Sequence, residues 1–171
     1  AYENRCTDFV YDSIGIGAGV KVKVAHSLGN TKLDVQGFCA SETPDNPKDR
    51  YEDNVLHEDL FLNKRAQGWW LLRDRFEKTY RAVEKGEFIN PDELISLSSD
   101  IKDLKVLRSE LVRVQRKRAN NTKIQIESKQ DMKKRGVSSP NMADALVYCF
   151  SNKPPKAGWN KPLVVKTSRR V

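Results

Sequence analysis

The chain has 171 residues, of which 38% are hydrophobic and 32% are charged, and its formal net charge is +8. This length and composition fit one folded domain and argue against a disordered chain. No apolar run approaches the roughly 18–20 residues that a membrane span needs, which argues against a transmembrane segment in this sequence. The first residue is Ala1 rather than Met, so we expect a fragment or a processed product.

The net charge is concentrated in the second half of the chain. Residues 101–136 hold twelve Lys and Arg against four acids, and residues 151–171 hold six Lys and Arg without an acid. The remaining residues hold thirteen basic and nineteen acidic side chains, a net charge of −6. A basic strip beside an acidic body indicates a polyanionic partner such as nucleic acid, although a solvated face with a basic tail has the same composition.

The first forty residues have the pattern of a strand–helix–strand unit. The apolar run Asp8–Asp12 predicts a strand, which a glycine-rich turn follows. Val20–Leu28 places apolar residues on one helical face and is followed by Gly29 and Asn30, which favour a helix end. The alternation over Leu33–Phe38 predicts a second strand. This order is typical of a βαβ unit in an α/β fold.

The middle of the chain predicts a long loop and then the clearest helix. Residues 40–57 are polar and contain two prolines, which favours a loop. Residues 63–85 follow the helical period and precede Gly86, so they predict a long amphipathic helix. We expect a second helix over residues 102–111. We also expect the apolar stripe of the long helix to face the core rather than to stack on bases; it comprises Ala66, Trp69, Trp70, Phe76, Tyr80 and Val83.

A basic β-hairpin is predicted after the second helix. Residues 112–118 and 123–127 both alternate, and Asn120 and Asn121 between them tolerate a tight turn. The hairpin would present several arginines and lysines on one face.

The last part of the chain predicts two helices and a tail. Ser128 is placed to cap a short helix over 129–135, which Gly136 would close. The pair Ser-Pro at the start of 139–150 is typical of a further helix. Residues 153–171 contain prolines and no periodicity, so we expect a basic tail. The lone cysteines show no zinc-site or disulfide spacing, and we expect them to be buried; they are Cys6, Cys39 and Cys149.

Two acids occupy unusual positions. Asp12 ends a predicted strand just before a glycine turn, where ligand sites of open α/β sheets gather. Asp144 lies between alanines on an apolar helix, and a buried unpaired carboxylate there would cost several kcal/mol. If the two converge, they suit a hard divalent cation such as Mg²⁺. Alternatively, Asp12 forms a turn and Asp144 faces solvent in the first turn of its helix.

Three blocks of the sequence follow one another along the chain: Tyr11–Val20, Asn63–Trp70 with Leu72–Phe76, and Ile126–Gly136 followed by Ser139–Leu146. Taken in this order, they resemble the nuclease domain of tailed-phage terminase large subunits, the motors that package DNA. The resemblance spans roughly residues 8–150, and the combination is far more specific than any one block.

The resemblance implies an α/β, RNase H-like fold in which helices flank a mixed sheet, with a nuclease domain over 1–152 and a tail over 153–171. It implies a metal-dependent endodeoxyribonuclease that cuts concatemeric double-stranded DNA during genome packaging. In this family three acids bind two Mg²⁺ or Mn²⁺ ions, and two of these acids map onto Asp12 and Asp144.

The third acid of the family lies on a strand upstream of the Tyr-Asp-Ser motif, and no segment of this chain matches that strand. Asp8 is a poor substitute, because four residues of strand separate it from Asp12 by about 13 Å. The family's ATPase domain, with its phosphate loop, has no counterpart either. We therefore expect the chain to lack the opening strand of the family fold.

Basic side chains of the hairpin and the short helix are expected to hold DNA phosphates without reading base sequence, with Lys129 nearest the scissile phosphate. The resemblance further implies contact with the terminase small subunit, the portal and the ATPase domain. It places the protein in the host cytoplasm, transiently docked on the procapsid and away from membranes. The candidate phosphate-binding residues are Arg113, Arg116, Lys117, Arg118, Lys129, Lys133, Lys134 and Arg135.

Two other functions fit the sequence. The chain could bind DNA or a packaging partner without hydrolysing anything, which predicts salt-sensitive DNA retention and no cleavage. It could also be another RNase H-like enzyme such as a resolvase or integrase. A resolvase would prefer four-way junctions to linear duplex DNA.

Overall fold

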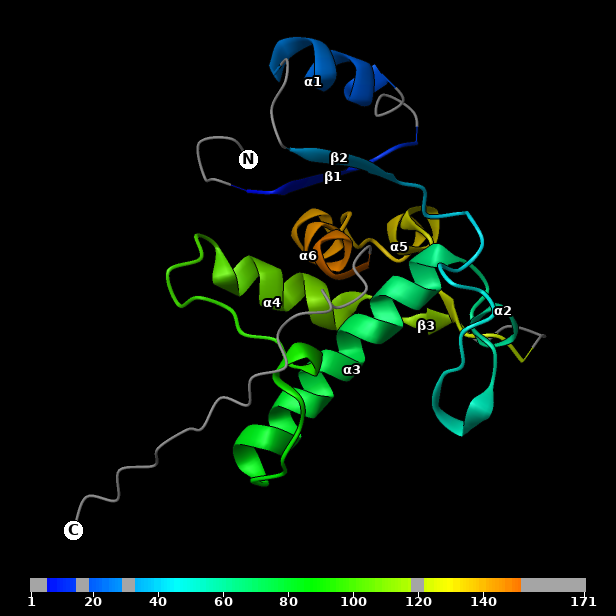
Figure 1. The fold of residues 1–171 in the computed structure, drawn as a ribbon, viewed down its shortest axis with the longest axis vertical. Helices are drawn as coiled ribbons and strands as arrows, with labels where there is room; N and C mark the ends of the chain where they lie inside the picture. Colours follow the sequence, from blue (N-terminus) through cyan, green and yellow to red (C-terminus); the bar gives the residue numbers. More distant parts are fainter. Residues whose placement is uncertain (1–5, 15–18, 29–32, 118–121, 152–171) are drawn as a thin grey trace.

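The computed structural model describes residues 6–14, 19–28, 33–117 and 122–151 (Figure 1). Gly15 and Gly17 of the first turn, the asparagines of the hairpin turn, Arg118 and the basic tail lie outside the described residues.

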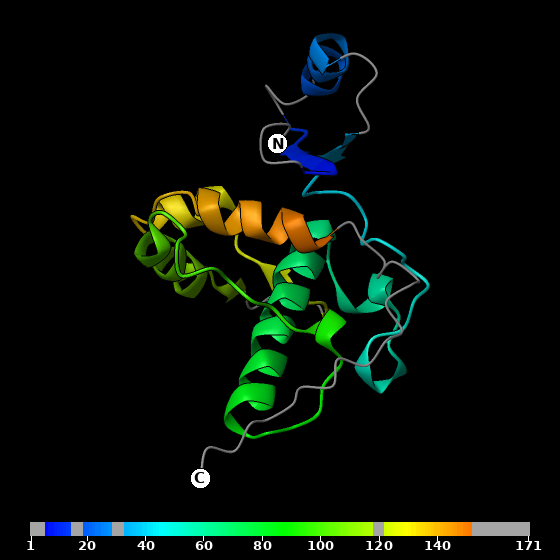
Figure 2. The same cartoon turned by 60° about the vertical axis from the view of Figure 1, so that its left-hand side comes forward.

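The chain begins with the expected βαβ unit. Strands β1 (Asp8–Asp12) and β2 (Asp34–Phe38) pair in parallel, with Asp12 opposite Phe38. Helix α1 (Val20–Leu28) joins them. Its apolar residues repeat with the helical period, whereas β1 is a short apolar run and β2 alternates. Figures 1 and 2 show the strand pair between α1 and α6 (Asn141–Ser151), and α6 contacts β1.

Helix α3 (Lys64–Glu84) is the longest helix of the described residues and the scaffold of the fold. The Asn63 side chain caps it by accepting a hydrogen bond from the Ala66 N–H at 2.9 Å. The prediction that its apolar stripe faces the core is wrong for Tyr80 and Val83, which are 58% and 72% exposed. The carboxyl-terminal half of α3 extends beyond the helices that cover its first half (Figure 2), and both side chains lie on this extension.

The region predicted as a loop, residues 40–57, contains the short helix η2 (Glu52–Asn54), and the short helix α2 (His57–Leu60) begins at its last residue. After α3, the chain forms the short η3 (Pro91–Glu93) and then α4 (Leu104–Arg113).

The hairpin is much shorter than predicted. Strands β3 (Arg116–Lys117) and β4 (Gln125–Ile126) have two residues each and pair antiparallel, while α4 includes two residues that the alternation assigned to a strand. Leu104, Leu107 and Leu111 pack against the core at helical spacing, so packing of α4 overrides the local alternation.

Helix α5 (Lys129–Lys134) follows β4 directly. Ser128 and Asp131 cap it reciprocally, and Gly136 closes it with a φ of +73°, as its sequence pattern predicts. Helix α6 begins just after Pro140, whose carbonyl accepts the Asp144 N–H at 2.7 Å.

The main core lies between α3, α4 and α6, and includes Trp69, Leu72, Leu107 and Val147. Helices α3 and α6 approach closely at Gly68, where a Cβ would lie 2.8 Å from a methyl carbon of Val147. No helix among the described residues is long and apolar enough to cross a membrane. The expected burial of the cysteines is wrong: Cys39 is half-buried, and Cys6 and Cys149 are exposed.

Candidate active site

Three elements bring Asp12, Asp144 and Lys129 together. The Lys129 ammonium lies 3.5 Å from Oδ2 of Asp12 and 3.4 Å from Oδ2 of Asp144. Asp12 is the last residue of β1, Asp144 lies in the first turn of α6, and Lys129 opens α5. The packing of α6 against β1 therefore places the two acids that the sequence singles out beside one cation.

Asp144 is a buried carboxylate with two unlike oxygens. Its side chain is 4% exposed. Oδ1 accepts hydrogen bonds from Nη1 of Arg65 at 2.8 Å and from the indole Nε1 of Trp69 at 3.2 Å. Oδ2 has no hydrogen-bond partner among the described residues and faces only the Lys129 ammonium. The alternative that Asp144 faces solvent is wrong.

Asp12 is held more loosely. Its side chain is 40% exposed, and its Oδ1 accepts the N–H of Ile14 at 3.0 Å. This hydrogen bond to a residue two positions ahead is the turn-forming contact expected of an aspartate after a strand. Asp12 thus forms a local turn and faces Lys129 with its other oxygen.

Tyr148 lies one helical turn after Asp144, and its ring stacks on Phe38 with centroids 4.4 Å apart. Burial raises the pKa of its hydroxyl, and the charges of Asp144 and Asp12 raise it further. The phenol therefore stays neutral near pH 7 and forms part of the wall beside the two acids.

The candidate phosphate-binding residues divide into two groups. Lys117 pairs with Asp131 at 2.9 Å, and Arg135 forms a two-pronged pair with Glu127 at 2.6 and 3.0 Å. Lys129 faces the two acids of the site. Four further candidates are exposed and have no ion pair to an acid within the described residues; they are Arg113, Arg116, Lys133 and Lys134.

The residues present fit a divalent cation at one atom in particular. Oδ2 of Asp144 is a buried carboxylate oxygen without a hydrogen bond, and carboxylate oxygens are the ligands that Mg²⁺ and Mn²⁺ prefer. Within the described part of the chain, no group of three or more Asp, Glu, His or Cys has the geometry of a metal site. Asp12 and Asp144 therefore meet as a pair of acids with a lysine.

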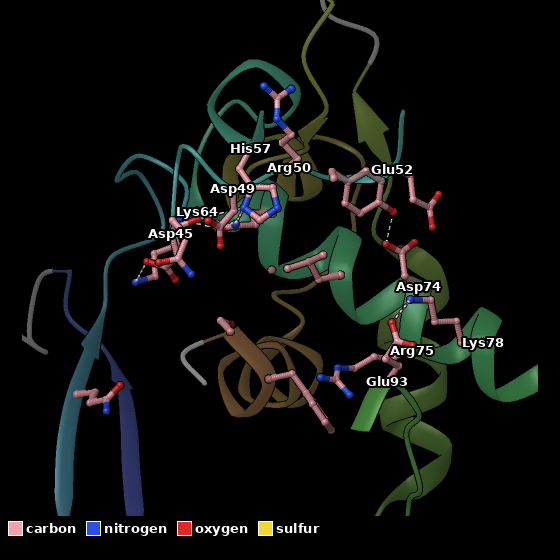
Figure 3. A pocket seen from close by; sticks show the side chains of 18 of the residues that line it. Asp45, Asp49, Arg50, Glu52, His57, Lys64, Asp74, Arg75, Lys78 and Glu93 are labelled. Atoms are coloured by element: carbon pink, nitrogen blue, oxygen red, sulfur yellow. Dashed lines mark hydrogen bonds and ion pairs between the residues drawn. The ribbon is translucent and has the colours of Figure 1, made fainter. Parts of the chain in front are cut away.

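A cavity of about 780 Å³ lies away from this site, between the loop before α2, helix α3 and the end of α6 (Figure 3). Burial raises the pKa of the Asp74 carboxyl on its wall, and the hydroxyl of Tyr51 opposes this rise by donating to it. Two ion pairs join charged groups of its wall, Lys64 with Asp45 at 2.9 Å and Lys78 with Glu93 at 2.6 Å. None of Asp12, Lys129 and Asp144 lines it, so we do not assign it as the active site.

Sequence reasoning missed Arg65 and Trp69. They stand one turn apart on α3, and the first four residues of this helix are all buried, although three of them are Lys64, Arg65 and Gln67. Buried charges need partners, so this cluster is a signal that could have pointed to an acid facing α3.

Two features bear on the class of this protein: an α/β fold, and two acids that meet between the end of a strand and a helix. A family model described as the terminase RNase H-like domain matches residues 1–152. The chain therefore belongs to this family, and the α/β, RNase H-like fold implied by the sequence is confirmed.

Solved structures agree with this assignment. The nuclease domain of the large terminase subunit gp2 of bacterial virus Sf6 is 36% identical with a TM-score of 0.84, and the match covers 90% of this chain and 68% of that one. A lysine-to-alanine mutant of gp2 with calcium gives 35% identity, a TM-score of 0.83 and the same coverage. A further structure of a mutant nuclease domain, with manganese, gives 35% and 0.84, covering 90% and 69%. No curated protein matches the chain.

Proposed function

We propose that this chain is the metal-dependent endonuclease part of a phage terminase large subunit, which cuts concatemeric double-stranded DNA during packaging. The observation that carries the proposal is the meeting of Asp12 and Asp144 at Lys129. Family membership and the likeness to a terminase nuclease domain support it, and structures of that relative contain manganese or calcium.

The two acids would hold the cation. When bound, a pair of Mg²⁺ or Mn²⁺ ions supplies an activated water and charge stabilisation at the leaving oxygen. Oδ2 of Asp144 is the ligand oxygen that the fold leaves free of hydrogen bonds, and Oδ2 of Asp12 faces the same space. Lys129 offsets the repulsion of the two carboxylates and would lie nearest the scissile phosphate.

The exposed cations of the strip would hold the rest of the DNA. Lysine and arginine bind phosphates without reading bases, so this surface suits cutting without strict sequence choice. Arg113, Lys133 and Lys134 would contribute most, because Lys117 and Arg135 share their charge with acids. By family membership, the small subunit, the portal and the ATPase domain would be partners in the host cytoplasm.

The test is nicking of supercoiled plasmid by the complete nuclease domain with Mn²⁺ or Mg²⁺. We expect nicked and linear products, which a chelator abolishes and which disappear in the Asp144→Asn and Asp12→Asn variants. Asp92→Asn is the matched control, since Asp92 is an exposed acid on η3. Wild-type cutting by Asp144→Asn would overturn the assignment of the site.

One observation favours a binding role without cleavage. Within the part of the chain that the structure describes, two acids meet at Lys129 and no cluster of three possible metal ligands occurs. This alternative predicts that the protein retains DNA in a salt-sensitive way and cuts at no metal concentration. The plasmid assay therefore separates the two functions.

A further inference from the structure

The buried Asp144 carboxylate is held from one side only. Both donors that reach it come from α3, and both reach Oδ1: Nη1 of Arg65 at 2.8 Å and Nε1 of Trp69 at 3.2 Å. They stand four residues apart, so one face of one helix supplies both. Oδ2, which is equally buried, receives no hydrogen bond within the described residues.

This asymmetry fixes the direction of the carboxylate. A hydrogen bond between a guanidinium and a carboxylate is short and strong, and a second donor on the same oxygen removes the freedom to rotate. With Oδ1 held, Oδ2 must point towards Lys129, which lies 3.4 Å from it, and towards the side where Asp12 stands.

The donors are themselves held in place. Nε of Arg65 faces the carbonyl of Glu127 at 3.4 Å, and its guanidinium lies 5.7 Å from the Trp69 ring centroid. Gly68, between the two donors, allows α3 to approach α6 so closely that no side chain fits there. The positions of Arg65 and Trp69 relative to Asp144 are therefore closely fixed.

A buried ion pair is weak evidence for stability, because desolvation offsets most of the attraction. An apolar pair of similar size would close this core at least as well. Stability therefore does not explain the pair of Arg65 and Asp144. The pair leaves Oδ2 of Asp144 free of hydrogen bonds within the described residues, and this oxygen suggests a role in binding a cation.

We propose that Arg65 and Trp69 are positioning residues, which hold Oδ1 of Asp144 so that Oδ2 is presented to a divalent cation beside Asp12 and Lys129. The identity of the cation rests on the proposed function. Neither side chain need touch the cation or DNA; each acts through Asp144.

The first test measures Mn²⁺ binding to the full chain, from the paramagnetic resonance signal of the free ion. Trp69→Phe keeps an aromatic six-membered ring in the core and removes the N–H donor together with the five-membered ring of the indole. Arg65→Lys keeps the charge and removes the planar fork. We expect each to weaken Mn²⁺ binding by about 10- to 100-fold, the usual effect of losing a residue that orients a metal ligand.

Trp70→Phe is the matched control, since Trp70 is the next residue on α3 and has no contact with Asp144 within the described residues. A merely structural role would lower the melting temperature of Trp69→Phe and leave Mn²⁺ binding unchanged, which would overturn the proposal. If Arg65→Lys fails to fold, Trp69→Phe still decides.

The second test needs no metal. The indole N–H signal of Trp69, assigned by its absence in Trp69→Phe, should exchange slowly with solvent and should move in Asp144→Asn. The signal of Trp70 should not move. A rapidly exchanging Trp69 signal that ignores Asp144→Asn would overturn the positioning role.

The two tests also separate this inference from the proposed function. If the wild-type chain binds no Mn²⁺ and the complete domain cuts no plasmid at any metal concentration, the proposed function is wrong and the cation part of the inference falls with it. If Asp144 is required for Mn²⁺ binding but Trp69→Phe binds as well as wild type, only the positioning role is wrong.

Discussion

The two sides of the candidate site carry ion pairs of nearly equal length in opposite surroundings. On the α3–α6 side, Arg65 and Asp144 lie 2.8 Å apart, with side chains 10% and 4% exposed. On the side of the hairpin and α5, Lys117 and Asp131 lie 2.9 Å apart, with side chains 45% and 28% exposed. Water and salt weaken the second interaction much more than the first.

This difference separates two tasks. Removing one member of a buried pair leaves an uncompensated charge and costs about 3–5 kcal/mol, whereas an exposed pair contributes about 0–1 kcal/mol. The buried side can therefore fix the direction of a carboxylate. The exposed side can exchange its partners for DNA phosphates at little cost.

The largest expected effect is that of Asp144→Asn. Loss of the charge leaves Arg65 buried without an acid, so we expect the free energy of unfolding to fall by about 3–5 kcal/mol. Plasmid cutting should fall below detection. Chemical denaturation and the nicking assay measure the two effects.

Asp12→Asn makes the contrast sharp. Asp12 faces the same ammonium, but its side chain is 40% exposed. We expect the same loss of cutting, with a change in unfolding free energy of no more than about 1 kcal/mol. Equal losses of stability in the two variants would break the comparison.

The next effect concerns how closely the buried side is packed. In Gly68→Ala the new Cβ would lie 2.8 Å from Val147 and 3.3 Å from the Ser151 hydroxyl oxygen, so α3 and α6 must separate. We expect a loss of about 1–3 kcal/mol from overpacking, which exceeds the gain of about 1 kcal/mol in helix propensity. Denaturation of Gly68→Ala beside Gly19→Ala measures it, because a Cβ at Gly19 meets none of the described residues within 4 Å. An unchanged stability would mean that the approach of the helices is not tight.

The sequence predicted the helices and strands whose formation depends on residues close to one another in the chain. The βαβ unit, the capped α5 and the long α3 all follow from local alternation, helical period or caps. The strand predicted over 112–118 was wrong at its start, because Leu104, Leu107 and Leu111 pack against the core and extend α4 instead. Long-range packing, which a local pattern does not contain, decided that boundary.

The same limit applies to the site. Asp12 and Asp144 stand out because an acid after a strand and an acid among alanines are locally unusual. Arg65 and Trp69 reach Asp144 across 79 and 75 residues, so only the packing of α3 on α6 reveals them. The roles of these residues in metal binding stay predictions.

On the side of the hairpin and α5, we expect DNA affinity to depend most on the lysines and arginines that have no acid partner within the described residues. Lys133→Ala and Lys134→Ala should each lower affinity and reduce the slope of log affinity against log salt by about 0.9. Lys117→Ala should reduce the slope less, because its ammonium already faces Asp131. Binding titrations over a salt series, with a chelator present, measure this. A larger effect at Lys117 than at Lys133 would contradict the division of the strip into paired and open cations.

The smallest expected effect is that of acid on the exposed pair. The hydrogen bond from Lys117, with those from Ser128, holds the pKa of the Asp131 carboxyl below its ordinary value of 3.8. Because the folded pKa is the lower one, the stabilisation is complete above 3.8 and is lost as the pH falls towards the folded pKa. Urea denaturation of wild type and Asp131→Asn should therefore show a small difference in the free energy of unfolding at about pH 7 that shrinks in acid.

The same difference should shrink at about 1 M salt, where the Debye length is roughly 3 Å, whereas the effect of Asp144→Asn should persist. If salt removes both effects equally, the Arg65–Asp144 pair is not shielded from solvent and cannot hold the carboxylate in one direction.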